Sequence, residues 1–194
     1  MNVRIKFNAD IRTSVWLGDE FMVNNYAINL QLITQSHDPE DHPVCLGRIR
    51  TILDQLEHSI LINQDHVDKI KELTACGFRV VALPQEPIDQ IMGIVLFQKL
   101  DAVLENRMRV TDLDLCSDVG DNIWFMHSAH ELVHEIPSTG WWADATPVCV
   151  NPAPAANKNK VVKLNRQLNW KTLELNWSSD TPTKTVIINI NDDK

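Results

Sequence analysis

The 194-residue sequence has no apolar run close to the roughly 20 residues that a membrane-spanning helix needs. Its first residues alternate like a strand and lack the apolar core of a signal peptide. The 18 Lys and Arg residues are dispersed among 26 Asp and Glu residues, apart from one loose cluster between Lys158 and Arg166, and the net charge is −8. Nucleic-acid-binding proteins usually carry a basic patch or stripe. We therefore expect neither a membrane nor a nucleic acid as a partner.

The chain also lacks paired cysteines. Cys45, Cys76, Cys116 and Cys149 have neither metal-binding spacing nor the spacing of a disulfide framework. Reduced thiols are typical of the cytoplasm, so we expect a cytoplasmic protein. Hydrophobic residues make up 44% of the chain and charged residues 23%, which is usual for a globular protein. The length suits one full domain and an appendage.

Hydrophobic periodicity predicts two hairpins and two long helices within residues 1–127. Alternation of apolar and polar residues indicates half-buried strands, and apolar residues at three- and four-residue spacing indicate helices. The predicted elements are strands at 2–8 and 25–34 around the turn Leu17-Gly18-Asp19, a helix from Leu46 to about Leu61, a short helix at 66–75, a short strand or link at 78–83, a helix from Ile88 to Leu104, and strands near 113–115 and 123–125 around the turn at Asp118–Asp121.

Residues 128–194 differ in composition from the first domain and form a predicted C-terminal extension. Prolines interrupt any long element there, and 151–160 has the composition of a linker. Alternating residues at 173–177 and 186–190 are compatible with a small hairpin. Four tryptophans lie in this part of the chain. We interpret them as side chains that pack the extension onto the domain, and a ligand-stacking surface is the alternative.

Several short motifs occur in a fixed order along the first domain. Asn25-Tyr26 opens the second strand, Leu56-Glu57-His58 lies at the end of the first helix, and Leu83-Pro84 precedes the second long helix. In this order the motifs resemble those of the 6-pyruvoyltetrahydropterin and 6-carboxytetrahydropterin synthases. The resemblance implies a T-fold in residues 1–127, which is an α+β ββααββ unit with a four-stranded antiparallel sheet and two long helices on one face. It also implies a homo-oligomer, because open sheet edges invite pairing with another chain.

The resemblance also implies roles for five residues. His58 matches a histidine that transfers protons in the family, and Glu57 would be its acidic partner. The alternative is that His58 only caps the helix. Cys116 stands where the family has a glutamate that anchors the ligand ring. Asp118 would substitute for that glutamate if the turn shifted register, and Glu86 enters the second long helix as a further ligand-binding candidate.

The family's zinc ligands are missing. The stretches that match them, 8–11 and 22–24, contain no histidine, and Asp10 and Asn24 would be poor substitutes. The family's cysteine between the first two strands has no counterpart either. We therefore expect no bound cofactor from this motif set.

A second motif, His130-Glu131-Leu132-Val133-His134, has the pattern H-E-x-x-H. On a helix, His130 and His134 would share one face and bind zinc, with Glu131 as the general base of a hydrolase. The context disfavours this hypothesis, because Pro137 would end such a helix within a turn and no third ligand follows at the expected spacing.

The sequence leaves four functions open. The first is a divergent T-fold protein that binds a pterin- or purine-like ligand, or an oligomeric homologue without catalysis. The second is an altered pterin-type lyase that uses Glu57 and His58. The third is a structural or interaction protein, and the fourth is a zinc hydrolase that uses the H-E-x-x-H motif.

Overall fold

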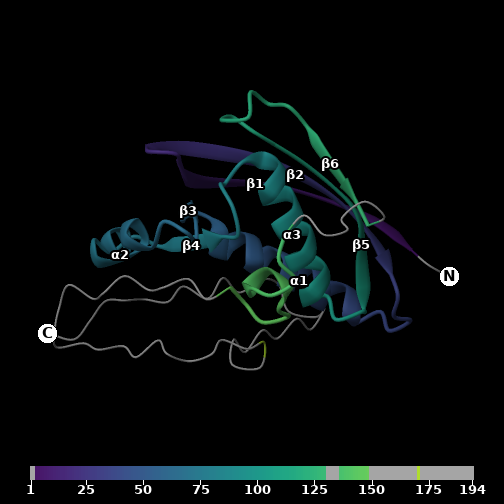
Figure 1. Cartoon of the computed structure of the whole chain (residues 1–194). Helices are drawn as coiled ribbons and strands as arrows, with labels where there is room; N and C mark the ends of the chain where they lie inside the picture. The colour runs from purple at the N-terminus through teal and green to yellow at the C-terminus, as the bar shows by residue number, and fades with distance from the viewer. Residues whose placement is uncertain (1–2, 130–135, 149–169, 171–194) are drawn as a thin grey trace, which may run out of the picture.

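A computed structural model describes residues 3–129, 136–148 and 170 of the chain. Within them, six strands form one curled sheet with three α-helices, so the predicted α+β class is confirmed (Figure 1). The elements are β1 (Arg4–Leu17), β2 (Glu20–Thr34), α1 (Asp41–Leu56), β3 (Ile60–Asn63), α2 (Val67–Ala75), β4 (Val80–Leu83), α3 (Asp89–Val103), β5 (Met108–Ser117), β6 (Phe125–Ser128) and the 3-10 turn η1 (Trp141–Ala143).

The long hairpin β1–β2 forms the centre of the sheet. Its register runs from Arg4 opposite Ile33 to Leu17 opposite Glu20. Gly18 has φ +60° in the connecting turn, a conformation that glycine adopts without steric cost. The apolar positions of both strands alternate, so every second side chain is buried on one face of the sheet. The sequence predicted this hairpin and its turn.

The sheet is larger than the predicted four-stranded antiparallel one, because two further strands pair parallel on the β1 side. The strand order is β4-β3-β1-β2-β5-β6, and β3 and β4 run parallel to β1. Ile60 and Leu61, which the helical period assigned to the end of the first long helix, are strand residues instead. Ile60, Leu61 and Ile62 are all buried, and an unbroken apolar run is typical of parallel strands covered on both faces. Helix α2 connects β3 with β4.

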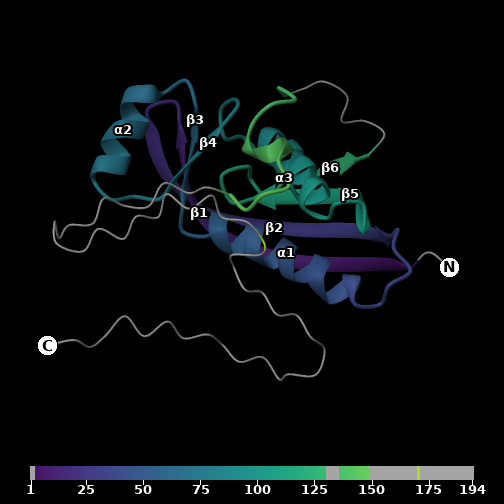
Figure 2. The ribbon, with the colours of Figure 1, turned by 90° about the horizontal axis from the view of Figure 1, so that it is seen from below.

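Helices α1 and α3 cover one face of the sheet (Figure 2). Their buried side chains pack on Tyr26, Ile28, Leu30 and the other inward residues of the central strands. We call this covered side the inner face. Residues between these positions, such as Asp10, Asn25 and Ala27, point to the opposite, outer face, because successive side chains of a strand alternate.

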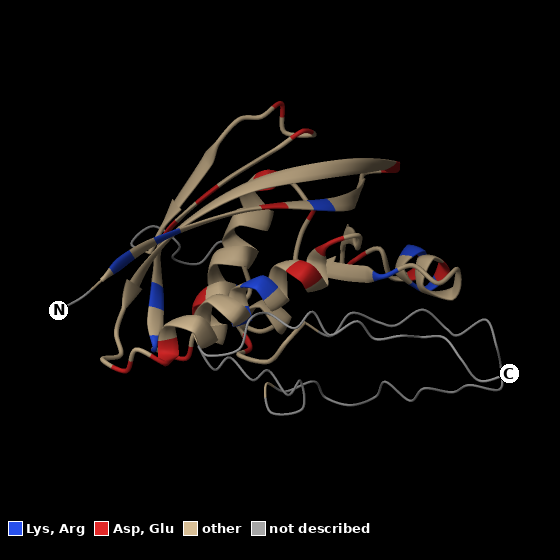
Figure 3. Ribbon diagram, turned by 180° about the vertical axis from the view of Figure 1, so that it is seen from behind, with Lys and Arg blue, Asp and Glu red and all other residues tan. Residues whose placement is uncertain are grey.

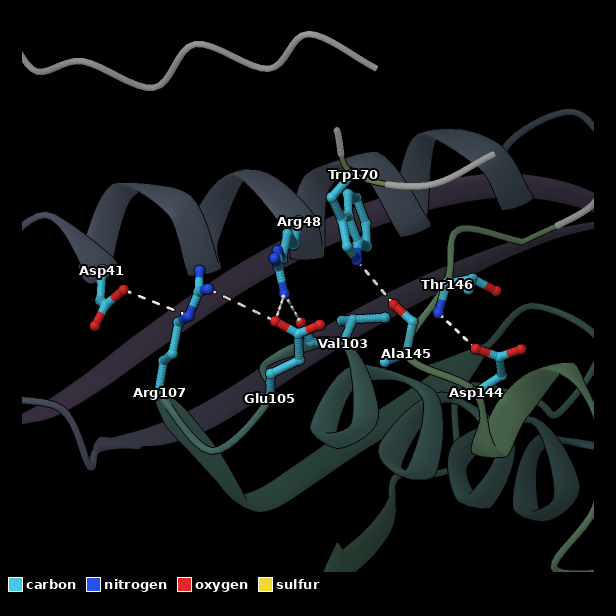
Figure 4. Close-up of polar contacts among 9 residues, drawn as sticks. All are labelled: Asp41, Arg48, Val103, Glu105, Arg107, Asp144, Ala145, Thr146 and Trp170. Atoms are coloured by element: carbon cyan, nitrogen blue, oxygen red, sulfur yellow. Dashed lines mark hydrogen bonds and ion pairs between the residues drawn. The ribbon is translucent and has the colours of Figure 1, made fainter. Parts of the chain in front are cut away.

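The described part of the C-terminal extension packs on α3. Lys99 is fully buried, and its Nζ donates hydrogen bonds of 2.6 Å to the carbonyl oxygens of Trp141, Asp144 and Thr146. Trp170 Nε1 donates to Ala145 O at 2.8 Å, and the Arg48 guanidinium lies 4.9 Å from the Trp170 ring centroid (Figure 4). The predicted linker at 151–160 and hairpin at 173–190 lie outside the described residues. None of the described helices is long and apolar enough to cross a membrane.

Candidate functional site

A cavity of about 440 Å³ lies on the outer face of the sheet. Three neighbouring strands form its floor, because Asp10 of β1, Ala27 of β2 and Cys116 of β5 are paired in register. The end of α1 and the β5–β6 loop form its sides. The residues that line it are Asp10, Ile11, Arg12, Asn25, Tyr26, Ala27, Glu57, Cys116, Asp118 and Asn122.

Cys116 and Asp118 reach the same cavity through the period of the strand. The side chains at i and i+2 share a face, and Ser117 between them points to the inner face. Asp118 therefore needs no shift of register to lie beside Cys116. Asn25 fixes it there, since Asn25 Nδ2 donates to Asp118 Oδ2 at 2.5 Å and Asp118 N donates to Asn25 O at 3.2 Å.

Cys116 is a poor nucleophile in this environment. Cys116 is only 5% exposed to solvent. Desolvation raises the pKa of the thiol, and the nearby carboxylates of Asp89, Asp118 and Asp10 raise it further. The thiolate is the reactive form of cysteine, so a raised pKa lowers the fraction of Cys116 that is reactive.

Glu57 lines the cavity, and His58 lies just outside it. Helix α1 ends at Leu56, and His58 adopts the left-handed region with φ +57° while its N–H donates to Arg12 O at 2.7 Å. Its imidazole is 71% exposed, and Nε2 is 3.9 Å from Glu57 Oε1, too far for a hydrogen bond. Of the expected acid–base pair, Glu57 lines the cavity and His58 does not, and no hydrogen bond joins the two side chains.

Glu86 lies elsewhere, at the ends of the parallel strands β3 and β4. Its Oε1 accepts hydrogen bonds from Asn63 Nδ2 at 3.1 Å and interacts with His66 Nε2 at 3.0 Å. Burial alone would raise the pKa of Glu86, but hydrogen bonds from His66, Asn63 and the Gly18 backbone outweigh it and lower the pKa. Glu86 therefore connects the β1–β2 turn, the end of β3 and the residue before α2, and it does not line the cavity with Glu57, Cys116 and Asp118.

The residues that replace the family's zinc ligands cannot act together on one ion. Asp10 points to the outer face, whereas Asn24 is 1% exposed on the inner face. In the described part of the chain, no group of three His, Cys, Asp or Glu side chains is arranged to hold a metal. His130, Glu131 and His134 lie outside the described residues.

Arg12, Asn25 and Asn122 also line the cavity, although their sequence motifs did not predict it. Arg12 and Asn25 lie opposite each other on β1 and β2, and both side chains point to the outer face. Strand alternation is therefore the sequence signal that could have identified them. Arg12 is the one cation among three carboxylates, Asp10, Glu57 and Asp118, in the cavity lining. The rest of the described basic residues are scattered over the strands and helices (Figure 3).

The solved structures that match the chain include three of 6-pyruvoyltetrahydropterin synthases. One is a catalytic-residue mutant from Plasmodium vivax, at 11% identity and a TM-score of 0.44, covering 66% of this chain and 97% of that chain. A second P. vivax structure has 10% identity and a TM-score of 0.43, covering 66% and 97%. The Plasmodium falciparum enzyme has 8% identity and a TM-score of 0.42, covering 65% and 96%.

No protein-family model matches the chain. No curated protein sequence matches it either.

Proposed function

We propose that this chain is a divergent T-fold protein that binds a pterin- or purine-like heterocycle in the outer-face cavity, without catalysing the synthase reaction. One observation carries the proposal. Glu57, Cys116 and Asp118 come from distant parts of the sequence, are site residues that the resemblance implies, and line the same cavity.

The chemistry of the cavity suits a flat ring with neighbouring N–H donors. Asp118 keeps Oδ1 for a ligand while Oδ2 accepts from Asn25. Carboxylates form strong, charge-assisted hydrogen bonds with such N–H groups. The volume of about 440 Å³ is within the usual range for small-molecule sites. Three carboxylates against one guanidinium disfavour a strongly anionic ligand.

Two features favour binding over catalysis. The Cys116 thiol has a raised pKa, and His58 is exposed and not hydrogen-bonded to Glu57. A general base needs a hydrogen bond to its substrate and a partner that orients it, and a nucleophile needs activation. The altered lyase and a purely structural role remain as outcomes of the test below.

Calorimetric titration of the full chain with neopterin, biopterin, guanine and adenine tests this function. We expect at least one of these rings to bind. Asp118→Ala should weaken that binding about tenfold or more, because one lost charge-assisted hydrogen bond is worth about 1.5–3 kcal/mol. The matched control is Asp19→Ala, which removes a carboxylate in the exposed β1–β2 turn. If no ring binds, or both variants behave alike, the proposal fails. Turnover of a bound ring would favour the lyase.

We also propose that the chain forms a homo-oligomer through its sheet edges. Among the described residues, the four-residue strands β4 and β6 are the edges of the sheet. Beside the β6 edge, Trp124 is 46% exposed and Met126 is 76% exposed. Exposed apolar groups next to unpaired strand atoms favour pairing with a second copy.

Light scattering on a sizing column should give a mass above that of one chain. Met126→Lys should lower that mass, and Val67→Lys on α2, an apolar position that is 52% exposed, should not. A wild-type chain that elutes as a monomer at micromolar concentration would contradict the oligomer.

A further inference from the structure

A group of buried polar side chains lies on the inner face, directly beneath the end of the cavity that Asp118 occupies. Asn24, Tyr26, Asp89 and Ser117 are each at least nine-tenths buried. Asn24 and Tyr26 belong to β2, Ser117 ends β5, and Asp89 begins α3. The group joins the first turn of α3 to the β5–β6 loop, residues 118–124.

Asp89 holds this loop through Ser117. Ser117 Oγ donates to Asp89 Oδ1 at 2.6 Å, and Gly120 N donates to Ser117 Oγ at 3.1 Å. A hydroxyl has one proton to donate and lone pairs to accept with. Because the Ser117 hydroxyl donates its hydrogen bond to Asp89, its lone pairs are directed to the Gly120 amide.

Asn24 holds the adjacent amide of the loop. Its Oδ1 accepts a hydrogen bond from Val119 N at 3.0 Å. On the other side of the sheet, Asn25 holds Asp118 through its side chain and backbone. The loop is therefore fixed from the inner face at residues 119 and 120 and from the outer face at Asp118.

Gly120 allows the close approach of the loop to Asp89. A Cβ atom at this position would overlap Asp89 Oδ2 and lie 2.9 Å from Asp89 Cγ. No side chain larger than hydrogen fits unless the carboxylate moves. The contact between α3 and the loop thus depends on both residues.

Packing alone does not explain a carboxylate at position 89. Asp89 is 6% exposed, and its Oδ2 has no hydrogen-bond partner among the described residues. Burial raises the pKa of Asp89, which the hydrogen bonds from Ser117 only partly offset. An apolar side chain would avoid this desolvation cost. The first turn of a helix favours a carboxylate, but a buried polar oxygen that is left without a partner still calls for an explanation.

We propose that Asp89 and Asn24 are positioning residues, which set the β5–β6 loop so that Asp118 and Asn122 face the cavity and thereby determine its affinity for a ligand. This role rests on the proposed function, since it is the heterocycle site that the loop completes. Neither residue touches the ligand.

The experiment compares Asp89→Ala, Ser117→Ala and Asn24→Leu with a matched control on the same helix. Asp101 is also a partly buried carboxylate with a raised pKa, and it accepts a hydrogen bond from Val110 N at 3.0 Å. Asp101→Ala therefore removes a comparable contact between α3 and β5, far from the loop. Asp89→Asn is the conservative variant, because its amide oxygen still accepts from Ser117.

Two measurements are made on each variant: hydrogen exchange of the Val119 and Gly120 amides without ligand, and calorimetric affinity for biopterin and guanine. We expect Asp89→Ala and Ser117→Ala to speed exchange at Gly120 about tenfold and to weaken binding about tenfold. Asn24→Leu should speed exchange mainly at the Val119 amide, which loses its acceptor. Asp89→Asn should stay within about threefold of wild type in both measurements, and Asp101→Ala should change neither.

Unchanged exchange at Gly120 in both Asp89→Ala and Ser117→Ala would overturn the positioning role, as would equal effects from Asp101→Ala. Faster exchange with unchanged affinity would also overturn it, because the loop would then not govern binding. If wild type binds neither probe, the proposed function fails by itself, and the exchange data still decide whether Asp89 holds the loop. If Asp89→Ala does not fold, Ser117→Ala supplies both measurements.

Discussion

At the scale of single residues, three described cysteines have different environments. Cys76 is exposed, whereas Cys45 and Cys116 are buried. Burial raises the pKa of Cys45 to about 11, and desolvation with nearby carboxylates raises that of Cys116. Alkylation requires the thiolate and access to it.

We therefore expect iodoacetamide at pH 8 to modify Cys76 at least about tenfold faster than Cys45 or Cys116. Peptide mass spectrometry of samples quenched over time measures the three rates. Labelling of Cys116 as fast as that of Cys76 would indicate an activated thiolate and would favour catalysis over simple binding.

His58 illustrates a backbone constraint that composition does not reveal. Its φ of +57° follows the end of α1, where glycine is the usual residue. We expect His58→Gly to keep or raise the free energy of unfolding, by up to about 1 kcal/mol, because glycine adopts this conformation without strain. Urea denaturation measures the change, with His58→Ala as the matched variant. A loss above about 1 kcal/mol for glycine alone would mean that the imidazole makes a stabilising contact.

At the scale of elements, alternation predicted the β1–β2 hairpin because each strand has one buried and one exposed face. The predicted strands, 2–8 and 25–34, are shorter than the observed ones. Strands β3 and β4 have no such alternation, since Ile60–Ile62 and Val80–Val81 are buried consecutively. The parallel pairing of β3 with β1 is non-local, β4 pairs only with β3, and a short apolar run does not distinguish strand from helix. The left-handed His58 that separates α1 from β3 has no sequence signature, because glycine is absent there.

Glu86 connects the end of β3, the residue before α2 and the β1–β2 turn through Asn63, His66 and Gly18. Its pKa is lowered in the folded chain, so the stabilisation is present at neutral pH and is lost as the pH falls through the folded-state pKa. We expect Glu86→Gln to lower the free energy of unfolding by about 1 kcal/mol at pH 7, since the side chain is partly exposed and solvent screens its interactions.

Urea denaturation of both proteins from pH 7 to pH 3 checks this prediction. The difference between wild type and Glu86→Gln should shrink toward zero on the acid side. A difference that stays constant across this range would show that the charge of Glu86 does not contribute.

At the scale of the whole molecule, Lys99 joins the described C-terminal segment to α3. Its three 2.6 Å hydrogen bonds go to backbone carbonyls that span residues 141–146, and its ammonium lies 5.7 Å from the Trp141 ring centroid. Lys99 occupies the apolar face of α3, four residues from Val95 and Val103. A lysine at a helical core position is therefore the sequence signal for this contact, although its partners lie more than 40 residues away.

We expect Lys99→Met to lower the free energy of unfolding by about 2–4 kcal/mol, because it leaves several carbonyls without a donor. Lys71→Met, at an exposed position of α2, should change it by less than about 0.5 kcal/mol. Thermal and urea denaturation measure both. A small effect of Lys99→Met would mean that water replaces the ammonium without cost.

The sequence predicted the site only in part, because residues that are distant in the chain come together in it. The resemblance implied Glu57, Cys116 and Asp118, but the floor of the cavity depends on the register of three strands, which a sequence does not state. Arg12 and Asn25 belong to the cavity through that register. Glu86 was assigned to it by motif order, whereas the β3–α2–β4 segment provides the partners that hold it elsewhere.

The most direct measurement of the central claim is an amide NMR titration of the full chain with biopterin and guanine. The account predicts saturable shifts that cluster at Asp10, Ala27, Cys116 and Asp118 for at least one of the two rings. Spectra that stay unchanged at millimolar ligand, or shifts centred on other elements, would contradict it.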